Sequence, residues 1–179
     1  MKKTKTLIKT GEKKIDKLFT ELVELRNFFM EQKENSLFFR ASLNGLYEKS
    51  DEIREFLHNS QKDIVNQYNE IAYKILEPSQ PTGLTKENAF SMYKKLIDSI
   101  KDNDEAYIEF NKKVPYTHAF KINMLQNELH KLITYHQYLF EVEKNVREIL
   151  AELNERLFEV NARLLKQMKG EEEWVFTKK

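Results

Sequence analysis

The feature that most constrains this chain is its C-terminal third, where residues Tyr116 to Met168 contain neither proline nor glycine. Apolar residues recur there at every third or fourth position, the spacing that places side chains on one face of an α-helix. The stripe consists of Phe120, Met124, Leu125, Leu129, Leu132, Ile133, Leu139, Val142, Val146, Ile149, Leu150, Leu153, Leu157, Val160 and Leu164. A straight helix of this length would extend for roughly 75–80 Å at 1.5 Å per residue. The sequence therefore predicts an elongated molecule, unless this helix bends or breaks.

The rest of the chain is equally poor in residues that end helices. It has only 4 Gly and 3 Pro among 179 residues, whereas strand-rich folds need turn residues at short intervals. Charged residues make up 33% and hydrophobic residues 40%, as expected of amphipathic helices with one buried face. We therefore predict an all-α fold, either an elongated helical bundle or antiparallel helical hairpins, with one long, coiled-coil-like C-terminal helix.

The helix-breaking residues divide this predicted single domain, residues 1–179, into segments. A helical hairpin region at 11–76 precedes a linker at 77–84, which contains Pro78, Pro81 and Gly83 and cannot continue a helix. A helical region follows at 85–169, and Gly170 begins a predicted tail at 170–179. Within the hairpin region we place the main break or kink at 44–50, and whether the first helix continues through 35–50 stays open.

Charge and cysteine content bear on partners and location. The formal net charge is +1, so the whole molecule has no strong attraction to nucleic acid or acidic lipid. The absence of cysteine excludes disulfides, thiolate metal sites and cysteine nucleophiles. The N-terminal lysines are not followed by an apolar run, and no stretch is apolar enough to span a bilayer. We therefore expect a cytoplasmic protein with no membrane span.

No pattern of residues predicts catalysis. The sequence has no phosphate-binding glycine loop, dinucleotide fingerprint or nucleophile elbow. Glu55 and His58 have the Glu-x-x-His spacing of di-iron bundles, but such sites need two copies of the motif. His130 and His136 are six residues apart and so lie on different helix faces. We expect no enzyme, no cofactor and no metal site, and Tyr135, Tyr138 and Phe140 are expected to fill a core or an interface.

Two terminal segments remain as candidates for binding. Trp174 and Phe176 are large apolar residues in the predicted tail, and we predict that they dock on a partner, with packing against their own bundle as the open alternative. The N-terminal lysines (Lys2, Lys3, Lys5, Lys9, Lys13 and Lys14) form a basic arm that could contact phosphates, although we favour the interpretation that it is a solvated tail.

The length of the apolar stripe leads to a functional hypothesis. One neighbour of ordinary length cannot cover it, so several helices, a second copy of the chain or another protein must do so. We therefore favour a non-catalytic helical interaction protein, such as an adaptor, an assembly factor or a chaperone-like module, whose partner is another protein or itself, with homo-oligomers expected. The alternatives are association with nucleic acid through the basic arm and a bundle that holds a ligand or metal.

Overall fold

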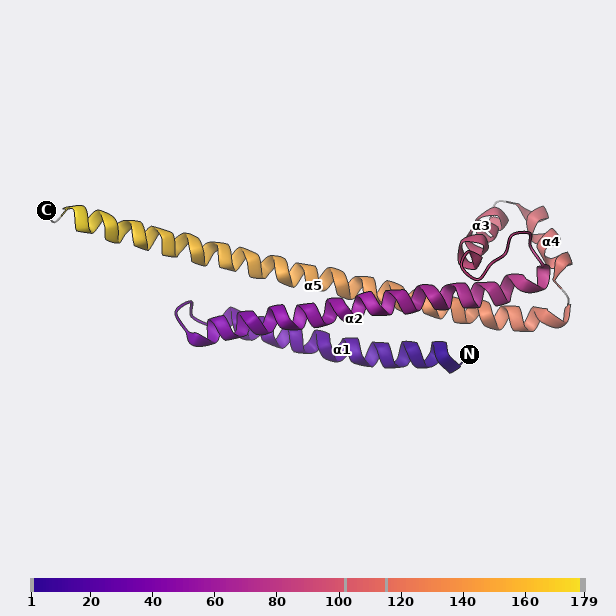
Figure 1. The fold of residues 1–179 in the computed structure, drawn as a ribbon, viewed down its shortest axis with the longest axis horizontal. Coiled ribbons are helices and arrows are strands. Elements are labelled where there is room, and N and C mark those ends of the chain that lie inside the picture. Colours follow the sequence, from indigo (N-terminus) through magenta and orange to yellow (C-terminus); the bar gives the residue numbers. More distant parts are fainter. Residues whose placement is uncertain (1, 102, 115, 178–179) are drawn as a thin grey trace. The chain divides into compact units, whose positions relative to one another are not determined.

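The computed structural model describes the backbone of residues 2–101, 103–114 and 116–177. Within these ranges it leaves out the side chains of residues 2–3, 106–107, 110–111, 116–117 and 171–177. The elements are α1 (Lys2–Glu31), α2 (Leu37–Leu76), a 3₁₀ turn η1 (Glu77–Ser79), α3 (Ala89–Lys101), α4 (Asp104–Lys113) and α5 (Tyr116–Thr177) (Figure 1). No strand occurs in the described ranges. The predicted all-α helical bundle with a long C-terminal helix is confirmed.

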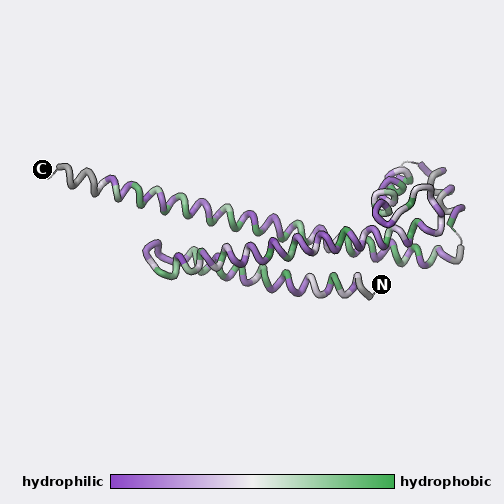
Figure 2. The backbone as a smooth tube through the Cα atoms, viewed as in Figure 1, coloured by the Kyte–Doolittle hydropathy of each residue, from purple (hydrophilic) through white to green (hydrophobic). Residues whose placement is uncertain are grey.

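The helices contribute to two compact units, each with its own core. Unit 1 comprises Met1–Lys14 and Phe56–Leu139, and unit 2 comprises Ile15–Glu55 and Phe140–Lys179. Hydrophobic and hydrophilic residues alternate along the long helices, as the colours of Figure 2 show. The buried apolar residues of unit 1 include Leu57, Ile64, Tyr68, Ile71, Ile75, Leu125, Leu129, Leu132, Tyr135 and Leu139. Those of unit 2 are Ile15, Leu18, Leu22, Phe29, Phe39, Leu46, Ile53, Val142, Val146, Leu153 and Val160.

The break between the first two helices lies at residues 32–36, so the predicted break at 44–50 is wrong. Ser36 begins α2, because its Oγ accepts a hydrogen bond from the backbone N–H of Phe38 at 3.1 Å. Gly45 lies inside α2, where a Cβ would already be in ordinary contact with Leu25 Cδ2 at 3.5 Å. Ser50 is buried and donates its hydroxyl to the carbonyl oxygen of Leu46, a bond made within a continuing helix.

The start of the first helix and the end of the last helix also differ from the prediction. The predicted start near Gly11 is too late, because α1 begins at Lys2, and the basic arm therefore belongs to this helix. Gly170 does not end α5, which continues to Thr177, so the tail predicted at 170–179 is helical to that residue. Glycine costs only about 1 kcal/mol relative to alanine inside a helix, which a long helix tolerates.

The connection after α2 agrees with the predicted end at Leu76. Gln80 and Gly83 have positive φ angles of 47° and 80°, the left-handed conformation that turns the chain. Thr85 and Asn88 then bond reciprocally, with Thr85 N–H donating to Asn88 Oδ1 at 2.8 Å and Asn88 N–H to Thr85 Oγ1 at 3.2 Å. This turn leads into α3.

Candidate interaction surfaces

Four residues of the predicted apolar stripe of α5 are buried in unit 2. Val142, Val146, Leu153 and Val160 are each at most 5% exposed. Their spacing keeps these side chains on one face of the helix, where they pack into the core of the unit. The prediction is confirmed for these four residues of the stripe. Ile149, Leu150 and Leu157 are only half-buried, and Phe120, which was also placed in the stripe, is 75% exposed.

Beyond Val160, none of the α5 residues whose side chains the structure describes is buried. Every described residue from 163 to 170 is exposed. Leu164, Leu165 and Met168 are 46%, 59% and 61% exposed, and Phe158, two turns before Leu165, is 75% exposed. We call these four residues the α5 apolar patch. Contiguous exposed apolar residues of this size mark interaction sites more often than single exposed leucines do.

The sequence prediction identified only one member of this patch. Leu164 belongs to the predicted stripe and was expected to be covered, whereas Phe158, Leu165 and Met168 lie outside it. Phe158, Leu165 and Met168 are exposed because they lie off the buried stripe. For Leu164, which continues the stripe, the physical reason is the position of the turn that joins the neighbouring helices. In unit 2, α1 ends at Glu31 and α2 starts at Leu37, whereas α5 extends to Thr177.

An arginine anchors α5 to the turn at residues 32–36. Arg156 donates from Nη1 to the carbonyl oxygen of Phe29 at 2.8 Å and from Nη2 to that of Gln32 at 2.5 Å. Its guanidinium lies 4.9 Å from the centroid of the Phe29 ring and 5.5 Å from that of Phe39. The last carbonyls of a helix lack intrahelical partners, so Arg156 satisfies the C-terminus of α1 while stacking on two aromatic rings.

Ion pairs on either side of Arg156 also hold α5 against α1 and the turn that follows it. Arg26 donates from both Nε and Nη2 to Glu152 Oε2, at 2.9 and 2.6 Å. Arg163 pairs with Glu34 in the turn. Three arginines therefore attach α5 to α1 and the turn just before the helix loses its cover.

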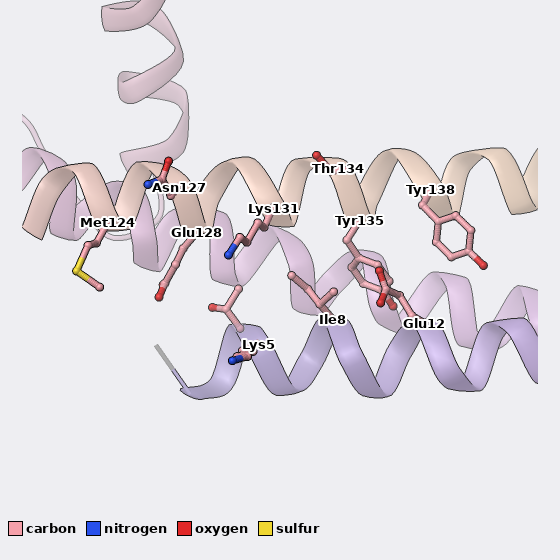
Figure 3. A pocket seen from close by; sticks show the side chains of 11 residues that line it. Lys5, Ile8, Glu12, Met124, Asn127, Glu128, Lys131, Thr134, Tyr135 and Tyr138 are labelled. Atoms are coloured by element: carbon pink, nitrogen blue, oxygen red, sulfur yellow. The ribbon is translucent and has the colours of Figure 1, made fainter.

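A second surface lies in unit 1, where α1 and α5 line a groove of about 920 Å³. Figure 3 shows Ile8 and Tyr135 facing each other across it, with Lys5 and Glu12 on α1 and Glu128 and Lys131 on α5. The remaining lining residues are Thr4, Met124, Asn127, Thr134 and Tyr138. The groove has an apolar floor and carries charges of both signs.

Tyr135, which lines this groove, packs closely against the backbone of α1. A Cβ on Gly11 would overlap the Tyr135 hydroxyl, so only glycine lets the ring come this close. Tyr135 is 3% exposed, and burial, with a smaller contribution from the charge of Glu12, raises its pKa to about 12. The hydroxyl therefore stays protonated at neutral pH, and the expectation that Tyr135 fills a core is confirmed.

His136 is part of an aromatic group on the other side of unit 1. Its Nδ1 lies 2.9 Å from the hydroxyl of Tyr68, whose ring stacks on Phe90 with centroids 4.5 Å apart. Burial lowers the pKa of His136 and raises that of Tyr68 to about 12. The neutral imidazole can accept the Tyr68 proton through Nδ1. Asn69 Oδ1 accepts from the backbone N–H of Phe90 at 3.0 Å, which fixes the start of α3 beside this group.

The other candidate metal ligands do not assemble into a site in the described part of the chain. His58 and His130 are exposed. No group of three or more His, Asp or Glu residues with the geometry to hold a metal ion occurs among the described residues. Phe140, predicted to lie in a core or interface, is 50% exposed.

The basic arm presents its described lysines to solvent. Lys5, Lys9, Lys13 and Lys14 are exposed along the first turns of α1. Lys14 also lies 5.3 Å from the centroid of the Phe56 ring. Unit 1 has 16 Lys and Arg against 11 Asp and Glu, a formal charge of +5, whereas unit 2 has 14 against 18, a charge of −4. The near-neutral chain therefore contains one basic unit and one acidic unit.

Trp174 and Phe176, the predicted partner-binding residues, lie in the helical part of α5. Their side chains fall outside the described residues, so their docking stays a prediction. Among the described residues, no helix is both long enough and apolar enough to cross a membrane.

Comparison with known proteins adds no further constraint on these surfaces. The chain matches no protein family, and neither a curated protein nor a solved structure shows significant similarity to it.

Proposed function

We propose that the protein is a non-catalytic helical interaction protein that binds a partner helix through the α5 apolar patch. The observation that carries this proposal is the loss of cover along α5 after Val160, although large apolar side chains continue. A helix that leaves its own core with Leu164, Leu165 and Met168 on its surface is suited to helix-in-groove or helix-on-helix binding, in which anchors recur every three or four residues.

The anchoring arginines support the same proposal. A binding surface is most effective when its scaffold is rigid, since ordering a mobile segment costs free energy on binding. Arg156, just before the patch, and Arg163, within its span, attach α5 to the turn at residues 32–36. The patch is therefore presented from a fixed helix.

Photo-crosslinking in the cells that make the protein tests this function. A benzophenone amino acid at position 158 replaces a side chain that is 75% exposed, and the same probe at Glu148, also exposed, is the control. We expect a crosslinked product from position 158 only, containing a peptide from an amphipathic helix, and we expect Leu165→Asp to abolish it. Equal products from both positions, or none from position 158, would contradict the proposal.

A second candidate function, association with a polyanion such as nucleic acid, is favoured by the charge of unit 1. Lys5, Lys9 and Lys13 are exposed on α1 in a unit with a formal charge of +5. Binding through lysines releases counterions and falls steeply with salt. Titration with a fluorescent oligonucleotide at two salt concentrations tests this candidate, and Lys9→Glu combined with Lys13→Glu should abolish binding.

A further inference from the structure

The distribution of charge around the α5 apolar patch identifies its partner. We infer that the patch pairs with the same patch of a second copy of this chain, with the two α5 helices antiparallel. This inference rests on the proposed function, because it names the partner that the patch binds.

The first observation is a charge gradient along the uncovered helix. Within the described segment 155–169, the exposed charged residues that make no ion pair are Glu155 and Glu159 before Asn161, and Lys166 and Lys169 after it. Two such helices placed parallel would bring like charges together, which is unfavourable. Placed antiparallel, they bring the glutamates of each copy to the lysines of the other.

The arginines of this segment do not alter this gradient, because they act within their own unit. Arg156 binds the carbonyl oxygens at the end of α1, and Arg163 pairs with Glu34. Glu152 is likewise held by Arg26. Within residues 155–169, the charges left for a partner are therefore acidic before Asn161 and basic after it.

The second observation is that the apolar residues fit the same antiparallel register. Phe158 and Leu165 are seven residues apart, so they lie two turns apart on one helix face. A twofold axis passing between Asn161 and Ala162 places Phe158 of each copy beside Leu165 of the other. The same axis brings Glu155 close to Lys169, and Leu164 and Met168 extend the apolar contact. A twofold contact of this kind is self-complementary and closes as a dimer.

Asn161 at the centre of this arrangement favours a single register. It is exposed in one copy and would face the middle of the paired helices. A polar residue at the seam of paired helices lowers stability but selects register and orientation. The paired segment, residues 155–169, is only about 21 Å long at 1.5 Å per residue, so we expect a reversible, concentration-dependent dimer.

Crosslinking of single-cysteine variants tests the orientation directly, because the chain has no cysteine of its own. Asn154→Cys and Met168→Cys replace exposed side chains near the two ends of the paired segment. A short bismaleimide should join the two variants when they are mixed, with one of them tagged to show which chains are joined. It should not join either variant to itself. Self-crosslinking of Met168→Cys would show parallel helices and would overturn the inference.

Charge reversal tests the electrostatic argument in full-length protein by light scattering across a concentration series. Variant A carries Glu155→Lys and Glu159→Lys, and variant B carries Lys166→Glu and Lys169→Glu. We expect each variant alone to be monomeric and an equimolar mixture to dimerise again. A helical circular dichroism spectrum for each variant confirms that the change does not unfold the chain.

The outcomes separate this inference from the proposed function. If the unaltered protein is monomeric at every concentration and the mixed cysteine variants stay unlinked, the second-copy inference is wrong. The proposed function then still stands if position 158 crosslinks to a helix of a different protein. If position 158 crosslinks to nothing, the proposed function and the inference fail together.

Discussion

Two successive parts of α5 both carry large apolar side chains but differ in burial. Val142, Val146, Leu153 and Val160 are buried in unit 2, whereas Leu164, Leu165 and Met168 are 46–61% exposed. Nothing in the local sequence separates them, since both parts are helical, rich in leucine and free of proline. The comparison shows that periodicity predicts which residues share the apolar stripe. The ends of the neighbouring helices decide whether its last residue, Leu164, is covered.

The largest expected effect is the loss of unfolding free energy when a buried leucine of α5 is shortened, compared with an exposed one. Leu153→Ala removes a side chain that is 2% exposed and should lower the free energy of unfolding by about 2–4 kcal/mol, since it leaves a cavity. Leu165→Ala, at a side chain that is 59% exposed, should change it by less than about 0.5 kcal/mol. Urea denaturation at low protein concentration measures both. Equal losses would mean that Leu165 is covered within its own chain.

The second prediction concerns the anchor between these two parts. Arg156→Ala removes two charge-assisted bonds to helix-end carbonyls and the stacking on Phe29, and it should cost about 1.5–3 kcal/mol. Lysine cannot form the same planar fork, so Arg156→Lys should recover only part of this loss. Arg147→Ala is the matched control, because its side chain is 73% exposed and makes an i, i+4 pair worth about 0.3–0.5 kcal/mol.

A third prediction compares a glycine that contacts another helix, Gly11, with one that has open space beside it, Gly170. Gly11→Ala should cost about 1–3 kcal/mol, because the added methyl overlaps the Tyr135 hydroxyl and forces the ring to move. Gly170→Ala meets no atom within 4 Å and should raise the local helix stability of α5 by up to about 1 kcal/mol. Thermal denaturation measures the first effect, and hydrogen exchange near residue 170 measures the second. If Tyr135→Phe in the Gly11→Ala background restores no stability, the overlap is not the cause.

The smallest effect is a pH dependence that distinguishes two histidines of α5. Burial lowers the pKa of His136 in the folded state, so the unfolded chain binds more protons near and below its ordinary value of about 6.5. Stability should therefore be highest above that pH and should decline as the pH falls through it. His136→Gln should remove this part of the decline, whereas His130→Gln, at an exposed position, should leave it unchanged. Urea midpoints at several pH values between 5 and 8 check the prediction.

The sequence predicted the helical class, the end of α2 at Leu76 and most of the buried stripe of α5, because each depends on local patterns. It misplaced the α1–α2 turn because Asn44-Gly45 and Ser50 resemble helix ends. In the structure, Gly45 lies close to Leu25 and Ser50 bonds to the carbonyl oxygen of Leu46, so neither ends the helix. The first contact is made with the neighbouring helix α1, and the second is a hydrogen bond within α2 itself. The helix propensity of a single residue describes neither of them.

For the candidate site, the sequence predicted surplus apolar surface on α5 but not its position. It placed Leu164 in a buried stripe and assigned binding to Trp174 and Phe176. Phe158, Leu165 and Met168 could have been found by plotting the apolar residues that lie off the main stripe. The exposure of Leu164, in contrast, depends on where α1 and α2 end.

The sequence by itself determined that this chain is helical, because few glycines and prolines interrupt a regular apolar spacing. Only the tertiary structure decided which apolar residues are buried, where the turn at residues 32–36 falls, and why Gly11 and Arg156 are needed. The physical reason is that helix formation depends on neighbours three and four residues away. Burial instead depends on residues more than a hundred positions apart, such as Phe29 and Arg156, which meet only in the folded protein.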